Sequence, residues 1–129
     1  MEYGIIICTH GKTGIEIVNS VKMIVGKAEN IESIKFLEHN SPEEITEKYK
    51  NAIKKLNKEK ILFLVDLKGG TPFNCAARLK FDNENYEVIT GLNIPMVITL
   101  LLEGDNLDFE DAVNLAINSG KEAIQLLRF

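Results

Sequence analysis

The sequence lacks any long hydrophobic run and any excess of positive charge. No segment reaches the roughly 18 consecutive apolar residues of a membrane-spanning helix, so we expect none. Glu2 stands where a secretory signal would carry basic residues, so we expect no signal peptide. The formal net charge is −4, which argues against a nucleic-acid partner because binding to a phosphate backbone requires a basic face.

Cysteine is scarce as well. The two cysteines, Cys8 and Cys75, form neither a C-x-x-C pair nor a zinc-binding spacing. Cys8 lies in an apolar stretch, where a thiol behaves as a small hydrophobic group. We therefore expect no disulfide and a reducing, cytoplasmic compartment.

Several nucleotide and hydrolase motifs are missing. The sequence contains no G-x-G-x-x-G and no G-x-S-x-G, which leaves a dinucleotide site and a hydrolase elbow without support. Residues 11–13 read G-K-T, but Ile6 stands where a phosphate-binding P-loop needs its first glycine. We expect no bound nucleotide or other cofactor.

What the sequence does contain is an alternation of strand-like and helix-like blocks within 129 residues, the size of one domain (1–129). Unbroken apolar runs predict strands buried on both faces, whereas an alternating run predicts an edge strand. These strands are expected at 3–8, 31–37 (the edge strand), 60–66 and 86–91, with helices at 14–26, 41–57, 71–81, 93–104 and 108–120. This order predicts an α/β fold with a mainly parallel sheet between two layers of helices. Residues 121–129 fit either a helix or a final strand.

Residues at the expected helix ends agree with this assignment. Ser41 and Glu44 have the spacing of a capping box. Thr71 and Asp108 are expected to be N-caps, and Gly120 is expected to end the last helix.

Polar residues follow two of the unbroken apolar runs. His10 follows the first run after one threonine, Thr9, and Asp66 ends the third strand. In an open parallel sheet, ligands bind at the carboxyl ends of the strands, where the strand order reverses. A carboxylate that accepts a hydrogen bond from one imidazole nitrogen fixes the tautomer and makes the other nitrogen more basic. The pair could therefore serve as a general base, a metal ligand or a nucleophile.

Glycines surround this pair. Gly11 precedes one expected helix, and Gly69 and Gly70, followed by the Thr71 hydroxyl, precede another. Helix N-termini bind anions through free N–H groups, so the arrangement predicts a cradle for a phosphoryl group bonded to His10. Purely structural roles remain as alternatives: a histidine at a strand end, a carboxylate that caps a loop, and a glycine turn.

Other assignments for these side chains have less support. A metal site built from Cys8, His10 and Asp66 requires Cys8 and His10 to point to one face of a continuing strand. The second histidine, His39, lies in a polar stretch and is expected to be solvated. For contacts with a partner protein we expect a set of apolar and basic residues beside the pair: Lys12, Leu67, Lys68 and Phe73.

Three segments carry a resemblance to a known family. They read GIIICTHG (4–11), ILFLVDLKGGTPFN (61–74) and GLNIPM (91–96). With them the chain resembles the mannose-type IIA component of the bacterial phosphoenolpyruvate-dependent sugar phosphotransferase system (PTS), of the mannose/fructose/sorbose family. The resemblance covers essentially the whole chain.

The resemblance implies a function as a phosphoryl carrier. In this family, the histidine that corresponds to His10 accepts a phosphoryl group from the phosphocarrier HPr. It passes the group to a IIB component, which phosphorylates sugar during transport through membrane components IIC and IID. By the same resemblance, Asp66 hydrogen-bonds the imidazole, while Thr71 and nearby backbone amides contact the phosphoryl group. Neither a metal nor a cofactor is implied.

The resemblance also implies a homodimer in which a C-terminal strand, here 123–129, pairs antiparallel with the partner subunit. The length of 129 residues leads us to expect the IIB component on a separate chain. Two alternatives remain open: a phosphoryl-donor subunit of a dihydroxyacetone kinase, and a sensor whose phosphorylation state controls a regulator.

Overall fold

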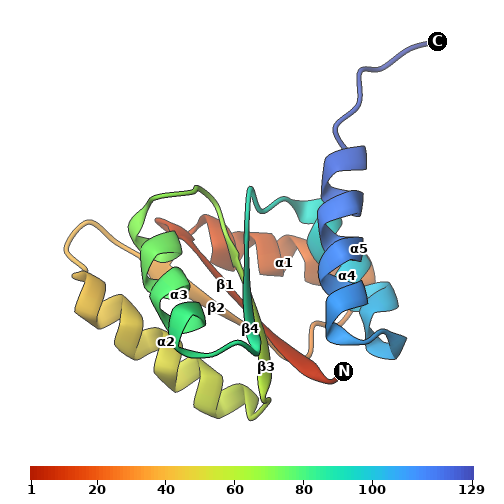
Figure 1. The fold of residues 1–129 in the computed structure, drawn as a ribbon. Coiled ribbons are helices and arrows are strands. Elements are labelled where there is room, and N and C mark those ends of the chain that lie inside the picture. Colours follow the sequence, from red (N-terminus) through yellow and green to blue (C-terminus); the bar gives the residue numbers. More distant parts are fainter.

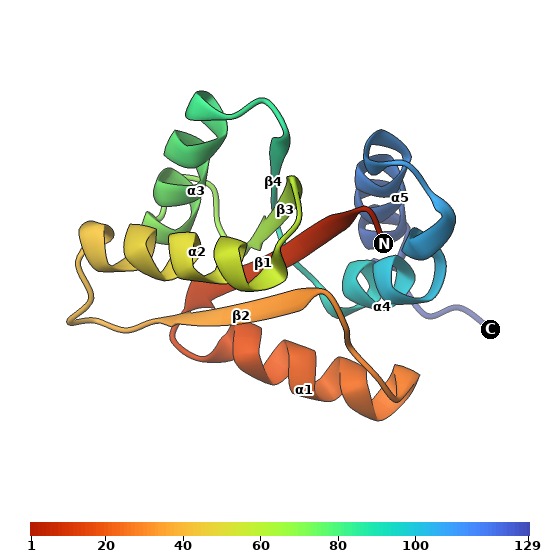
Figure 2. The same ribbon diagram turned by 90° about the horizontal axis from the view of Figure 1, so that it is seen from below.

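The computed structural model describes residues 1–129 and contains a four-stranded sheet in the order β2-β1-β3-β4, with every neighbouring pair parallel. The strands are β1 (Tyr3–His10), β2 (Ile31–Phe36), β3 (Lys60–Val65) and β4 (Tyr86–Thr90). The helices are α1 (Thr13–Val25), α2 (Pro42–Leu56), α3 (Thr71–Asp82), α4 (Ile94–Glu103) and α5 (Phe109–Glu122), with a short 3₁₀ turn at Gly104–Asn106. Helices α2 and α3 cover one face, and α1, α4 and α5 cover the other (Figures 1 and 2). The expected α/β architecture is confirmed.

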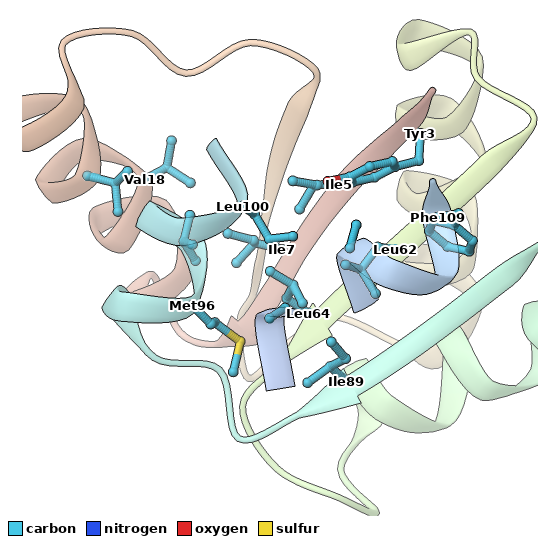
Figure 3. Close-up of a cluster of buried hydrophobic side chains, with 14 residues drawn as sticks. Tyr3, Ile5, Ile7, Val18, Leu62, Leu64, Ile89, Met96, Leu100 and Phe109 are labelled. Atoms are coloured by element: carbon cyan, nitrogen blue, oxygen red, sulfur yellow. The ribbon is translucent and has the colours of Figure 1, made fainter. Parts of the chain in front are cut away.

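The two central strands, β1 and β3, are buried on both faces because their apolar runs supply side chains to two separate cores. Ile5 and Ile7 pack towards α1, α4 and α5, while Ile6 and Cys8 pack towards α2 and α3. Figure 3 shows the first of these cores, where side chains from β1 and β3 meet Met96, Leu100 and Phe109. Each fully buried aliphatic or aromatic side chain stabilises the fold by about 1.5–3 kcal/mol. Strand β2, with its alternating pattern, lies at an edge as expected.

Capping follows the sequence at most helix starts. The Ser41 hydroxyl accepts a hydrogen bond from the Glu44 amide, and the Glu44 carboxylate accepts one from the Ser41 amide, which completes the expected capping box. Asn93 caps α4, and Asp108 caps α5 as expected.

Two expected helix ends are wrong. Gly70, in an extended conformation, is the N-cap of α3, so Thr71 is the first helical residue and its side chain makes no capping hydrogen bond. Helix α5 continues through Gly120 to Glu122. Gly120 is buried against α4, where an added Cβ would lie 2.8 Å from Cε of Met96. Its glycine therefore serves helix packing rather than termination.

The C-terminal residues 124–129 form neither helix nor strand, and their side chains are exposed. They extend away from the body of the molecule beyond α5 (Figure 1). A swapped strand at 123–129 remains a prediction, because it requires a second chain. No helix combines the length and apolar character needed to cross a bilayer.

Candidate active site

The site lies where the strand order reverses. β1 pairs with β2 on one side and with β3 on the other, and the carboxyl ends of β1 and β3 meet at one edge of the sheet. These ends carry His10 and Asp66, so the structure brings together the pair that the sequence predicts. Such a reversal is the usual position for a ligand in an open α/β sheet.

One oxygen of Asp66 receives two hydrogen bonds from the same residue. Oδ2 lies 2.9 Å from Nδ1 of His10 and 3.0 Å from the backbone nitrogen of His10. The other oxygen, Oδ1, accepts from the Leu67 amide at 3.0 Å. Partial burial pushes the pKa of Asp66 upward, but the hydrogen bonds and the proximity of His10 outweigh burial and hold the pKa below its usual value. Asp66 is therefore ionised at neutral pH.

The ionised carboxylate fixes the tautomer of His10. A carboxylate can only accept hydrogen bonds, so Nδ1 carries the imidazole proton and Nε2 keeps its lone pair. The His10 side chain is 47% exposed, which leaves the ring accessible to another molecule. Nε2 is thus the ring nitrogen that faces away from Asp66 and keeps a lone pair.

Two neighbours restrict the imidazole ring. The Phe36 ring lies edge-on to it, with a centroid distance of 5.4 Å and an interplanar angle of 75°. On Gly70, an added Cβ would lie 2.7 Å from Cε1 and 3.2 Å from Nε2 of His10, so only glycine leaves room for the ring. Gly11 and Gly69 are needed for a different reason, since their φ angles are 65° and 88°.

Two helices begin beside His10, and both lack a side-chain cap at the N-cap residue. α1 starts after Lys12 and α3 starts after Gly70, and neither of these residues offers a side-chain oxygen to the first turn. The other three α-helices have such a cap. Uncapped amides together with the helix dipole attract an anion. At α1 the Thr9 hydroxyl takes the Gly14 amide and the Phe36 carbonyl takes the Gly11 amide, so the predicted phosphoryl cradle depends on the remaining amides of the two helix starts.

The expected partner-contact residues differ in their accessibility. Lys12, Lys68 and Leu67 are exposed, and neither lysine forms an ion pair within the chain. Phe73 is only partly exposed, which makes it a weaker contact than the sequence suggests. The His10 side chain is nearly half exposed, so the site is open to solvent.

The metal alternative fails on position. Cys8 is fully buried in the core between the sheet and α2 and α3, and burial raises the pKa of its thiol to about 11. No three metal-binding side chains of histidine, cysteine, aspartate or glutamate gather anywhere in the chain. Both cysteines are free thiols. The second histidine, His39, is exposed as expected.

Sequence reasoning did not identify two residues that contact His10. Phe36 pairs with His10 in the β1–β2 register, and that register cannot be read from one sequence. Thr9 is buried, and its hydroxyl hydrogen-bonds the backbone on both sides of the strand end. The available signal for Thr9 was a hydroxyl residue placed between an apolar run and the histidine.

Comparison with known proteins shows the family of the chain. The family model described as "PTS system fructose IIA component" matches residues 4–117. The PTS system mannose-specific EIIAB component of Escherichia coli is 40% identical over 130 residues, and the alignment covers 99% of this chain. The chain spans only 40% of the length of that relative. The PTS system fructose-specific EIIA component of Bacillus subtilis is 32% identical, with 85% of this chain and 76% of the relative covered.

Solved structures give the same result. The phosphotransferase system component EIIA of Streptococcus agalactiae superposes with a TM-score of 0.88 at 29% identity, and 95% of each chain is covered. A mannose/sorbose specific IIA subunit from Enterococcus faecalis, 24% identical, shares the fold with a TM-score of 0.90 and covers 100% of this chain and 97% of its own. The chain belongs to the family of PTS IIA components of the mannose, fructose and sorbose type.

Proposed function

We propose that the chain is a cytoplasmic phosphoryl carrier of a sugar PTS. Nε2 of His10 accepts a phosphoryl group from phospho-HPr and passes it to a IIB component, which serves uptake of a sugar through membrane components IIC and IID. The observation that carries the proposal is the 2.9 Å contact between Nδ1 of His10 and Asp66, which leaves Nε2 free beside the uncapped start of α3.

The chemistry follows from the tautomer. The Nε2 lone pair attacks phosphorus in line, the Nε2–P bond forms, and the N–P bond of the donor histidine breaks and returns its electron pair to that ring. The proton on Nδ1 stays in place, so the phosphorylated ring of His10 carries positive charge, which the Asp66 carboxylate stabilises. Positioning and electrostatics supply catalysis in phosphoryl transfer generally, and this step needs no metal or cofactor.

The open helix starts give the phosphoryl oxygens their partners. The amide of Gly11 itself is taken by the Phe36 carbonyl at 2.7 Å, so the donors for the phosphoryl oxygens are the remaining amides at the start of α1 and those of the turn through Gly69 and Gly70 into α3. The Thr71 hydroxyl is not used as a cap and is available to donate a hydrogen bond. An oxyanion in this position is stabilised by donors that need no reorganisation.

The relatives favour the sugar transporter branch over the dihydroxyacetone kinase alternative. They include mannose-, fructose- and sorbose-specific PTS components. This agreement supports a IIB protein as the acceptor, and the identity of the acceptor is what the experiment must test.

We also propose that the active protein is a homodimer in which residues 123–129 add an antiparallel strand to β4 of the partner subunit. Strand β4 is an open edge of the sheet. A pocket of about 450 Å³ runs beside it and is lined by Val88, Ile89 and Ile117. The tail carries exposed apolar side chains that could fill this space in a second copy: Ile124, Leu126, Leu127 and Phe129.

The proposed transfer can be tested by mass measurement. The protein is mixed with phosphoenolpyruvate, enzyme I and HPr, and a IIB protein is then added. We expect one acid-labile phosphoryl group on His10, which disappears as the IIB protein gains it. His10→Ala should take up no phosphoryl group, while His39→Ala, which changes the other, exposed histidine, should behave like the unchanged protein. Full labelling of His10→Ala would refute the proposal. Transfer to a dihydroxyacetone kinase subunit and none to a IIB protein would refute the sugar PTS as the pathway and support the dihydroxyacetone kinase alternative.

A further inference from the structure

The buried hydroxyl of Thr9 lies directly before His10. Thr9 is only 1% exposed, although it adjoins a histidine that faces solvent. It is the one buried residue that is neither hydrophobic nor glycine nor proline. A buried hydroxyl needs hydrogen-bond partners, and the partners of Thr9 belong to the two segments that form the site.

The hydroxyl joins the end of β1 to the start of α1. Oγ1 of Thr9 accepts a hydrogen bond from the Gly14 amide at 2.7 Å, and it donates one to the His10 carbonyl at 3.1 Å. Gly14 is the second residue of α1, and Lys12 at the N-cap provides no side-chain hydrogen bond. The strand thus supplies the cap that the helix itself lacks.

Close packing makes this junction rigid. An added Cβ on Gly14 would lie 2.7 Å from Cγ2 of Ile7 and 3.2 Å from Cγ2 of Thr9. The helix start therefore rests against the strand, and the hydroxyl fixes its position along that contact. The Gly14 amide is therefore bound by Thr9, and the Gly11 amide by the Phe36 carbonyl, so both ends of the turn between β1 and α1 are held by hydrogen bonds.

We propose that Thr9 is a positioning residue for phosphoryl transfer, which sets the first turn of α1 relative to His10. The inference rests on the proposed function, since it assumes that Nε2 attacks phosphorus while amides of this turn hold the phosphoryl oxygens. Thr9 does not touch the phosphoryl group. Its hydroxyl keeps the nucleophile and these amides at a fixed separation, and a displacement of about 1 Å can slow a reaction by about 100-fold.

Two variants separate the hydroxyl from the shape of the side chain. Thr9→Val keeps the branched shape and removes both hydrogen bonds, whereas Thr9→Ser keeps the hydroxyl and removes a methyl group. We measure transfer from phospho-HPr by rapid quench over a range of HPr concentrations. In Thr9→Val the maximal rate should fall by about 10- to 100-fold, and the KM for phospho-HPr should stay the same because the exposed docking residues are unchanged. Thr9→Ser should transfer within a few-fold of the unchanged protein.

The outcomes distinguish this inference from the proposed function. If the unchanged protein takes up no phosphoryl group, both fail. If it does, and Thr9→Val transfers at the same rate or Thr9→Ser is as slow as Thr9→Val, only the role of the Thr9 hydroxyl is overturned. Should Thr9→Val not fold, amide exchange in the unchanged protein decides: the Gly14 amide should exchange slowly although it lies in the first turn, and fast exchange would contradict the proposed hydrogen bond.

Discussion

Replacing Asp66 with asparagine tests the electrostatic part of the site with little change in shape. In the native protein Asp66 accepts three N–H groups: two from His10 at Oδ2 and one from Leu67 at Oδ1. An asparagine has one oxygen and one NH₂ group, so one side of the carboxamide must face an N–H donor. If the NH₂ group faces His10, the ring must adopt the other tautomer, and its proton then blocks Nε2.

The expected loss of rate in Asp66→Asn follows from the hydrogen bond that strengthens during the reaction. Only the contact between Nδ1 and Oδ2 strengthens as positive charge develops on the ring, and only such interactions raise the rate. A hydrogen bond to a charged group contributes about 1.5–3 kcal/mol. At about 1.4 kcal/mol for each factor of ten, transfer from phospho-HPr should slow by roughly 10- to 100-fold.

Rapid-quench measurement of phosphoryl uptake at saturating phospho-HPr gives this rate directly. The control is circular dichroism of Asp66→Asn, which should match the unchanged protein at neutral pH. An unchanged rate in a folded Asp66→Asn protein would refute the orienting role of the carboxylate. If Asp66→Asn does not fold, its rate says nothing about the carboxylate. The ring tautomer is then read from the nitrogen chemical shifts of His10 in the unchanged protein, where a proton on Nε2 would also refute the orienting role of Asp66.

The same substitution has a consequence for acid stability. The hydrogen bonds from His10 hold the pKa of Asp66 below its ordinary value of 3.8 in the folded state, against the opposing effect of burial. The stabilisation is therefore complete above the ordinary value and is lost as the pH falls through the folded-state pKa. Urea unfolding at a series of pH values should show the stability difference between the native protein and Asp66→Asn shrinking as the pH drops below that ordinary value. A difference that stays constant down to the acid transition would contradict this assignment.

Further predictions concern other parts of the chain. Gly70→Ala should displace the ring of His10, because the new Cβ would lie 2.7 Å from Cε1. Phosphoryl transfer should therefore slow by at least tenfold, which corresponds to about 1.4 kcal/mol. A rate within twofold of the native value would contradict the close approach of Gly70 to the ring. Ser41→Ala should lower the free energy of unfolding by about 1 kcal/mol through loss of the capping box, with transfer unchanged, as measured by urea titration. Removal of residues 124–129 should convert the proposed dimer to a monomer in analytical ultracentrifugation, and a truncated protein that is dimeric would exclude the swapped strand.

The sheet could be predicted from sequence because its strands carry two distinct patterns. The unbroken apolar runs in β1 and β3 require burial on both faces, which places these strands at the centre. The alternating residues of β2 suit an edge. Once the strands are parallel, their carboxyl ends share one edge of the sheet, so His10 and Asp66 could be brought together without any knowledge of coordinates.

The errors arose where tertiary contacts decide the outcome. Gly120 looks like a helix stop, but the close approach of α4 requires a residue without a side chain inside α5, and the Gly120 carbonyl accepts a hydrogen bond from Nδ2 of Asn93 at 3.0 Å. Thr71 has a good capping side chain, yet Gly70 takes the N-cap because the His10 ring occupies the space beside it. The contact of Phe36 with His10 depends on strand register, which local patterns do not specify.

The exposure of His10 affects how long the proposed phosphorylated form would last. The side chain is nearly half exposed, so under the proposed function water reaches a phosphoryl group on this ring. Spontaneous hydrolysis then competes with delivery whenever the molecule is unaccompanied. Under the proposed function, the chain would hand over its phosphoryl group between successive encounters rather than store it, and the phosphorylated fraction at steady state should follow the supply of donor almost immediately.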